Sequence, residues 1–234
     1  MNTASVSKKI LVLTANPIGS DRLRLDKEVR EIGEGLRRSA QREQFQLEQR
    51  WAVRLQDLHR ALLDVKPQIV HFSGHGAGEG GLMLEDEQGK ATFVSTAMLQ
   101  ELFKLFAVVG VECVVLNACY SEAQAIVISQ HIPFVIGMPD WVNDRLSIAF
   151  SVAFYDAIGD GQDYEFAFRL GAIQFADVPV ERKPLLKKGQ ESKRSLSTAA
   201  ASDFDRGLAQ PKIEPSNIGV STQGDVHITT FNMN

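Results

Sequence analysis

Short apolar runs alternate with longer amphipathic stretches along the first three quarters of the chain. Most runs are rich in Val, Ile and Leu and end at Gly, Pro, Asn or Ser, which is typical of buried strands. One run instead alternates apolar and polar residues, as a half-buried strand does. The predicted strands are 9–15, 45–51, 68–73, 112–118 and 133–138.

The amphipathic stretches carry apolar residues at helical spacing, as Leu25, Val29 and Ile32 show in the first of them. Helices are predicted at 22–42, 55–65, 96–106, 123–130, 144–158 and 164–175, and a small hairpin at 82–84 and 91–94. Strands that alternate with helices indicate an α/β fold, a mostly parallel sheet flanked by helices on both faces. Such a sheet presents its functional groups at the carboxyl ends of the strands.

The composition changes after Ala176. Residues 181–194 contain six basic and two acidic side chains, and a Ser/Ala-rich stretch and then a polar segment follow them. We expect one domain over residues 8–176, a flexible basic linker over 177–206, and a polar, β-prone C-terminal tail over 207–234.

Composition and charge narrow the possible environments. The chain is 44% hydrophobic with a net charge of −4, which gives no indication of nucleic acid or an anionic membrane as partner. No apolar run reaches the about 18 residues of a membrane span, and the run after Lys9 ends in Asn-Pro, unlike a signal peptide. Two cysteines, Cys113 and Cys119, are too few for a disulfide framework. We therefore expect a cytoplasmic protein.

Two predicted strands end next to residues with catalytic chemistry. The third strand runs into Gly74-His75-Gly76, and the fourth runs into Cys119. Because adjacent parallel strands end at the same edge of a sheet, His75 and Cys119 should lie close together. An imidazole beside a thiol can hold it as the nucleophilic thiolate. This pair predicts a cysteine nucleophile with a histidine general base.

The neighbouring backbone suits the same chemistry. The glycines on both sides of His75 allow a sharp turn and close approach of a substrate. The backbone amides of Gly76 and Cys119 are candidate donors for an oxyanion hole. A helix predicted directly after Cys119 would favour the thiolate through its dipole.

Other kinds of site could use some of these residues. A zinc site would recruit His71, His75, Cys113 and Cys119. The chain has neither a CxxC pair nor an HExxH helix, so we expect no metal, and we interpret His71 and Cys113 as buried structural residues. Glycine-rich residues 74–81 could bind phosphate, but no Gly-Lys-Ser/Thr follows them. A flavodoxin-like nucleotide-binding module would place phosphate ligands at 16–20. We expect no cofactor.

The motifs resemble the CHAT family, caspase-like peptidases of the caspase/separase clan. The matching segments are 10–32, 67–76, 114–121 and 134–158. The resemblance covers roughly residues 8–176. It implies a caspase-like fold, a catalytic dyad at His75 and Cys119, and cleavage of a protein or peptide substrate through an acyl-enzyme.

One position departs from the related metacaspases, which carry an aspartate two residues before the cysteine and select basic side chains. This chain has Asn117 there, and a neutral amide can hydrogen-bond a substrate but supplies no countercharge. Asn117 therefore predicts no strict selectivity for Arg or Lys. Asp140 and Asp144, after the fifth strand, are further candidates for substrate binding, or else they cap the next helix.

The end of the tail has its own pattern. Residues 217–234 alternate β-prone residues with Gln, Asn and Gly and carry almost no charge, which is compatible with cross-β pairing. The segment resembles the short amyloid-type signalling motifs of bacterial immune effectors, or it is a disordered or edge-strand tail. We predict a regulated cysteine endopeptidase of bacterial signalling or defence, activated by a partner protein through this tail. The alternative is a catalytically silent adaptor that acts through protein–protein contacts.

Overall fold

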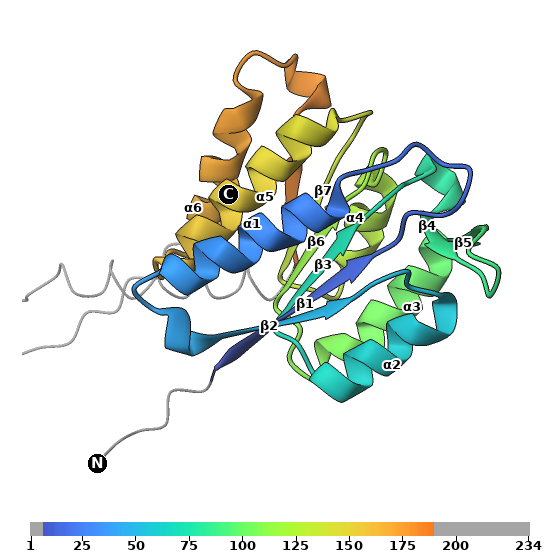
Figure 1. Ribbon diagram of the computed structural model, residues 1–234, viewed down its shortest axis with the longest axis horizontal. Coiled ribbons are helices and arrows are strands. Elements are labelled where there is room, and N and C mark those ends of the chain that lie inside the picture. Colours follow the sequence, from blue (N-terminus) through green and yellow to red (C-terminus); the bar gives the residue numbers. More distant parts are fainter. Residues whose placement is uncertain (1–6, 190–234) are drawn as a thin grey trace, which may run out of the picture. The chain divides into compact units, whose positions relative to one another are not determined.

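The computed structural model describes residues 7–189, which form a six-stranded sheet in the order β2-β1-β3-β6-β7-β8 (Figure 1). All neighbouring strands are parallel except β8, which runs antiparallel to β7. A separate antiparallel hairpin, β4-β5, follows β3. The strands are β1 Lys8–Thr14, β2 Phe45–Arg50, β3 Ile69–Ser73, β4 Leu82–Glu85, β5 Ala91–Val94, β6 Cys113–Asn117, β7 Phe134–Gly137 and β8 Leu185–Lys188.

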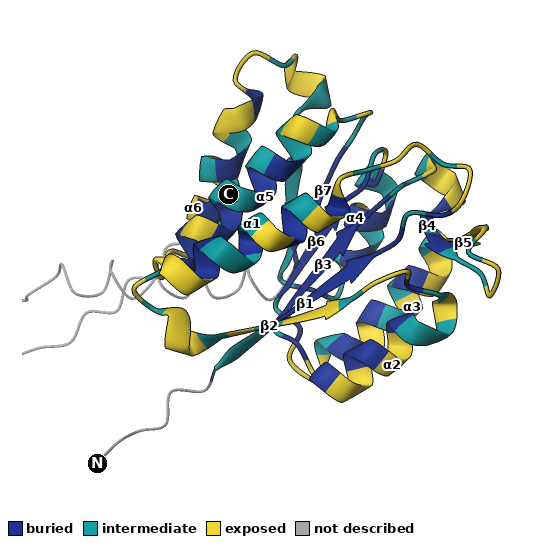
Figure 2. Ribbon diagram, in the orientation of Figure 1, coloured by how far each residue is buried: buried dark blue, intermediate teal, exposed yellow. Residues whose placement is uncertain are grey.

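Helices cover both faces of the sheet, so that the central strands are buried on both sides (Figure 2). One face packs against α1 Leu25–Arg38, α5 Asp144–Gly159 and α6 Tyr164–Ala172. The other face packs against α2 Leu55–Val65, α3 Thr96–Ala107 and α4 Glu122–Ile128. The predicted α/β architecture is confirmed. Continuous apolar strands are the expected consequence of burial on two faces.

Two helix starts show how far local sequence determines the boundaries. Ser95 caps α3 as its sequence predicts, because its hydroxyl accepts a hydrogen bond from the Met98 amide at 3.3 Å. The helix predicted from residue 22 begins only at Leu25, since Ser20 bonds the Pro17 carbonyl at 2.7 Å and forms a turn instead of a cap. This turn leaves residues 17–24 as a loop beside the carboxyl ends of the strands.

The fold extends beyond the boundary that the composition predicts. Residues 180–182 form a 3₁₀ turn, and β8 then pairs with β7 from Phe134 opposite Lys188 to Gly137 opposite Leu185. The basic residues here belong to the sheet, and their charged ends reach acidic helix residues: Lys187 bonds Glu122 at 3.3 Å. The linker therefore cannot begin at residue 177. The rest of the predicted linker and the whole tail, 190–234, lie outside the described residues.

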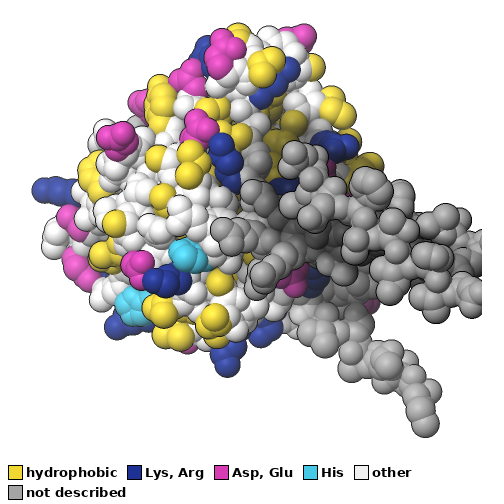
Figure 3. Space-filling view, turned by 180° about the vertical axis from the view of Figure 1, so that it is seen from behind, with side chains coloured by type: hydrophobic (Ala, Val, Ile, Leu, Met, Phe, Trp, Pro, Cys, Tyr) yellow, Lys and Arg dark blue, Asp and Glu magenta, His cyan; other side chains and the backbone are white. Residues whose placement is uncertain are grey.

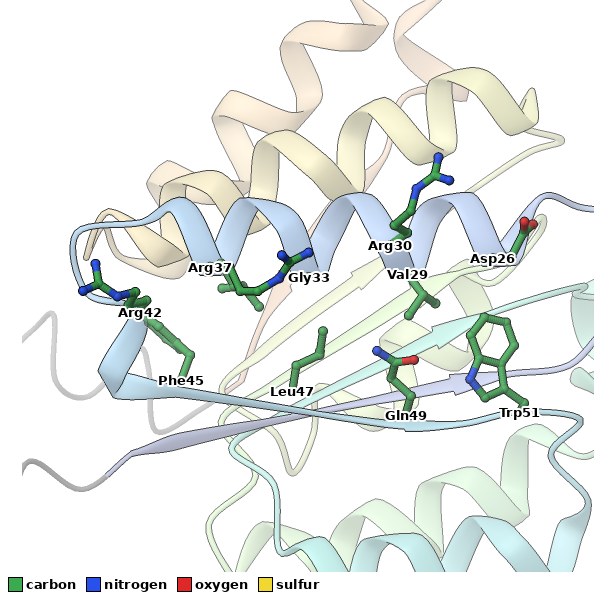
Figure 4. Close-up of a pocket in the computed structure, with 11 residues that line it drawn as sticks. Asp26, Val29, Arg30, Gly33, Arg37, Arg42, Phe45, Leu47, Gln49 and Trp51 are labelled. Carbon is green, nitrogen blue, oxygen red and sulfur yellow. The ribbon is translucent and has the colours of Figure 1, made fainter.

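The opposite edge of the sheet is formed by β2, which lies under α1 (Figure 4). Leu47, Gln49 and Trp51 point from the strand toward the helix, and a cavity of about 520 Å³ lies between them. This cavity contains neither His75 nor Cys119.

One face of the described part of the chain carries charges of both signs. Figure 3 shows basic and acidic side chains interspersed over the face seen from behind. Among residues 7–189, no helix is both long enough and apolar enough to cross a membrane.

Candidate active site

Strands β3 and β6 bring His75 and Cys119 to the same edge of the sheet. The two strands pair in parallel up to Ser73 opposite Asn117, and the Gly74 amide then donates to the Asn117 carbonyl at 3.3 Å. His75 and Cys119 therefore both follow the last paired residue of their strand by two positions. Their side chains line one cavity of about 360 Å³, as the sequence-based argument requires.

The His75 ring is oriented by Asn16, which follows β1. Its Nε2 lies 3.2 Å from the Asn16 Oδ1 atom. Asn16 is held in turn, because its backbone amide donates to the Glu85 carboxylate at 3.0 Å. A carbonyl oxygen only accepts, so Nε2 carries the proton and Nδ1 is left free to accept one. Asn16 is thus a residue of the site that the sequence analysis assigned only to a phosphate-binding alternative.

The Cys119 thiol contacts the segment that precedes α5. Its Sγ accepts a hydrogen bond from the Val142 amide at 3.3 Å and lies 3.9 Å from the Val142 carbonyl. Burial raises the pKa of the Cys119 thiol, and the charge of Asp140 adds to that rise, while the Val142 amide opposes it. Within residues 7–189, no hydrogen bond joins Cys119 to His75. Burial is thus the largest influence on the pKa of this thiol, and the favourable effect of the following helix on the thiolate stays a prediction.

Gly76 is required by the close approach of the two loops. A Cβ atom at this position would lie 2.1 Å from the Cys119 carbonyl oxygen. Within the described part of the chain, neither the Gly76 amide nor the Cys119 amide donates to another backbone oxygen. Neither amide is therefore occupied by another backbone group of the described residues, and their role as oxyanion-hole donors stays a prediction.

In the turn after Cys119, one residue has a strained backbone conformation and the next is held by hydrogen bonds. Tyr120 has a φ of 56°, in the left-handed region that residues other than glycine rarely adopt. The Ser121 hydroxyl holds the next position, because it donates to the Leu116 carbonyl at 3.1 Å and accepts from the Met138 amide at 2.9 Å. Together these bonds fix the direction in which Cys119 leaves β6.

A buried polar network lies beneath the dyad and centres on Glu28 of α1, which is 2% exposed. Its Oε1 accepts hydrogen bonds from Asn117 at 2.6 Å, Ser151 at 2.6 Å and His71 Nε2 at 3.1 Å. Its Oε2 accepts one from Ser73. Burial alone would raise the pKa of Glu28, but the hydrogen bond and charge of His71 and the hydrogen bonds from Ser151 and Ser73 outweigh it and lower the pKa below its usual range.

The sequence analysis did not identify Glu28 as a candidate site residue, although its position in the helical pattern indicates one. It lies three residues after Leu25 and four before Ile32, on the apolar stripe of α1. A charged residue in such a stripe must either be paired or be functional.

The other predicted substrate-binding residues occupy different places. Asn117 and Asp144 line the cavity with the dyad, and Asp144 forms an ion pair with Arg24 at 2.9 Å. Asp140 does not line it and forms an ion pair with Arg182 at 2.6 Å. The Trp141 amide is the main cause that lowers the pKa of Asp140, and the Arg182 charge contributes. Neither aspartate caps α5, because the Asn143 side chain does.

The residues of the zinc alternative are divided between two environments. His71 is fully buried and bonds Glu28 and the Tyr155 hydroxyl, and Cys113 is fully buried in the core. His75 and Cys119, in contrast, line the cavity. In the part of the chain that the structure describes, no group of three or more His, Cys, Asp or Glu side chains could hold a metal ion.

Two curated relatives are proteases by name. A "Roc-COR-CHAT protease" from an unknown prokaryotic organism is 25% identical over 174 residues, which are 72% of this chain and 16% of the relative. A "Probable protease" from Gillisia limnaea is 25% identical over 173 residues, which are 72% of this chain and 31% of the relative. The chain thus spans less than a third of the length of either relative.

Solved structures with a similar fold include two cysteine proteases. A secreted C11 cysteine protease from Bacteroides thetaiotaomicron, in complex with an irreversible peptide inhibitor, superposes with a TM-score of 0.58 at 12% identity, over 84% of this chain and 69% of the other. The Drosophila initiator caspase Dronc superposes with a TM-score of 0.51 at 12% identity, over 80% and 84%. These similarities show that the fold is caspase-like.

The sequence itself also matches a family profile. The profile of the CHAT domain matches residues 2–179, which include every residue of the cavity described above. With its caspase-like sheet and this match over most of its length, the chain belongs to the CHAT domain family.

Proposed function

We propose that this chain is a cysteine endopeptidase in which Cys119 is the nucleophile and His75 the general base. The observation that carries the proposal is the placement of both side chains in one cavity by the adjacent parallel strands β3 and β6. The family membership and the protease names of the relatives agree with it.

In the first half-reaction, His75 Nδ1 takes the thiol proton and the Cys119 sulfur attacks the carbonyl carbon of the scissile peptide bond. The hydrogen bond to Asn16 keeps the other ring nitrogen protonated and so leaves Nδ1 as the acceptor. The amides of Gly76 and Cys119 stabilise the oxyanion that forms. The C–N bond then breaks as His75 returns the proton to the leaving amine, and a thioester remains on Cys119.

In the second half-reaction, water attacks the thioester and His75 accepts its proton. The C–S bond breaks and the carboxylic acid product leaves, and His75 returns the proton to the sulfur, which restores the resting thiol. The same histidine thus acts as base and acid in turn.

The contacts of Cys119 show what must change before the first step. The thiol is held by Val142, and its raised pKa keeps it protonated. Productive binding therefore requires the segment before α5 to release the thiol toward His75. Catalytic hydrogen bonds are often formed only in the substrate complex.

The test compares Cys119→Ala, His75→Ala and the double variant in a peptide-library cleavage assay, with His59→Ala on the exposed face of α2 as the matched control. Each dyad variant should lose at least about 10³-fold in kcat/KM, and the double variant little more, because the two residues act as one unit. A single dyad variant that cleaves normally would show that the dyad assignment is wrong.

Alkylation gives a second readout that needs no substrate. Iodoacetamide should modify Cys119 and spare Cys113, which is fully buried and whose pKa burial raises strongly. Since the pKa of Cys119 is also raised, its alkylation rate should keep increasing with pH beyond about 8.5, the ordinary value for a thiol. A rate that is already maximal at neutral pH would contradict the described environment.

We further propose that the peptidase is a regulated effector of bacterial signalling or defence. The Val142 contact and the raised pKa of Cys119 support a resting state of low activity. The same two observations would favour a catalytically silent adaptor if the dyad variants changed nothing in the cleavage assay. The activating partner is proposed to bind the tail, 207–234, which lies outside the described residues.

A further inference from the structure

The inner end of the dyad cavity is formed by three buried polar residues, Glu28, Ser73 and Asn117. The remaining polar residues of the lining are more exposed and lie toward solvent. A substrate side chain that enters beside Cys119 therefore meets Glu28 at the far end of the cavity. The volume of about 360 Å³ falls within the range of about 300–1,000 Å³ that is typical of ligand pockets.

The two oxygens of Glu28 are not equivalent. Oε1 accepts three hydrogen bonds, from His71, Asn117 and Ser151. Oε2 accepts one, from Ser73. Oε2 therefore has fewer donors around it than Oε1 and is the oxygen with room for a further one. Its partner Ser73 lines the cavity, as does Asn117, whereas His71 and Ser151 do not.

Within the part of the chain that the structure describes, Glu28 forms no ion pair with a lysine or arginine, although the exposed Arg22 lines the same cavity. Among residues 7–189, its only ion-pair partner is His71. Both ring nitrogens of His71 are engaged in the core, since Nε2 donates to Glu28 at 3.1 Å and Nδ1 lies 3.2 Å from the Tyr155 hydroxyl. Of the other two acids of the lining, Asp21 is exposed and Asp144 is already paired with Arg24. Glu28 therefore leaves a buried negative charge that a bound cation would compensate.

We propose that Glu28 is the specificity-determining residue of this cavity and that the peptidase cleaves after arginine or lysine. The inference rests on the proposed peptidase function and adds its substrate class. Asn117 alone predicts no such selectivity, but its amide nitrogen bonds Glu28 at 2.6 Å and so holds the carboxylate that supplies the charge. A guanidinium or ammonium group that reaches Oε2 forms a charge-assisted hydrogen bond in a water-poor site.

The test uses the full chain and two peptide substrates that differ only at the cleaved position, one with arginine and one with citrulline, its neutral isostere. The wild-type protein should prefer arginine. In Glu28→Gln the preference should fall by about 30-fold or more, the factor that corresponds to ~2 kcal/mol for loss of one partner of a buried charge pair. Glu101→Gln, the same change on α3, should keep the wild-type preference.

Each contrary outcome has a different meaning. Equal cleavage of both peptides by the wild-type protein overturns the role of Glu28 but leaves the peptidase function intact. A preference that persists in folded Glu28→Gln but disappears in Asp144→Asn assigns the role to Asp144 and overturns the proposal. Cleavage of neither peptide, together with no reaction of Cys119 with a peptide electrophile, removes the peptidase function and this inference with it.

A second measurement needs no variant, in case Glu28→Gln fails to fold. Benzamidine, a small cation, should slow the alkylation of Cys119 by iodoacetamide in the wild-type protein, and neutral benzamide should not. Equal effects of the two compounds, or no effect of either, would show that the cavity does not select a cation.

Discussion

At the scale of single residues, the chemistry of the site depends on which ring nitrogen of His75 is free. Asn16 decides this, since its side-chain oxygen lies 3.2 Å from Nε2 and can only accept a hydrogen bond. Glu28 acts in a comparable way one layer deeper, where it gathers four donors around a buried carboxylate. Both residues act by orienting neighbouring side chains. Such an effect depends on the three-dimensional arrangement and cannot be predicted from the spacing of residues along the sequence.

Replacing Asn16 with alanine should lower kcat/KM by about 10²-fold, because a histidine base that is displaced by about 1 Å loses that much. Asn16→Asp should restore part of the rate, since a carboxylate also accepts from Nε2. Its negative charge favours the protonated imidazole, so the acidic limb of the pH–rate profile should shift to higher pH. The measurement is kcat/KM against pH for the three proteins. If Asn16→Ala has the wild-type profile and rate, Asn16 does not orient the base.

At the scale of elements, the site lies where the three neighbouring strands β1, β3 and β6 end. The loops that follow these strands supply Asn16, His75 and Cys119. Their loops pack so closely that Gly76 has no room for a side chain next to the Cys119 carbonyl. The position of the nucleophile is therefore coupled to the backbone of the histidine loop.

Gly76→Ala should abolish cleavage and cost about 1–3 kcal/mol of stability. The new Cβ would lie 2.1 Å from the Cys119 carbonyl oxygen, so the Cys119 backbone would have to move away from it. The matched control is Gly80→Ala in the same loop, whose Cβ would lie 3.3 Å from the exposed Ala77 side chain and can be accommodated by a small shift. Cleavage rate and melting temperature are measured for both. Full activity in Gly76→Ala would mean that the loops are not coupled as described.

The elements also show what sequence can and cannot predict. Periodicity identified the strands of the parallel core and the order of helices, because burial on two faces leaves continuous apolar runs. The meeting of His75 and Cys119 followed from the topology of parallel strands. The role of Val142 could not be predicted, since it donates through its backbone. Strand β8 was missed because it is a short edge strand of two leucines and two lysines, and its partner Phe134–Gly137 lies far away in the sequence.

At the scale of the whole molecule, β8 is the last strand or helix that the structure describes, and residues 190–234 lie beyond the described part of the chain. Residues up to Lys188 complete the sheet, and Arg182 connects this part to Asp140 beside the loop that holds Cys119. The segment beyond, with its nearly uncharged end at 217–234, has too few apolar residues to form a core of its own. A segment of this kind gains order by pairing its backbone with another chain.

We therefore expect truncation after Arg194 to leave the melting temperature unchanged and to remove activation by assembly. Truncation after Ala176, the matched control, should lower the melting temperature by about 5 °C or more, because it removes β8 and exposes the β7 edge. Fusing a parallel coiled coil after Arg194 should restore cleavage, since enforced pairing raises the effective concentration of the peptidase domains. Melting temperature and cleavage rate are measured for the full chain, both truncations and the fusion. If the chain that ends at Arg194 melts at a much lower temperature than the full chain, the tail is part of the fold. If that truncated chain cleaves as fast as the activated full chain, the tail has no signalling role.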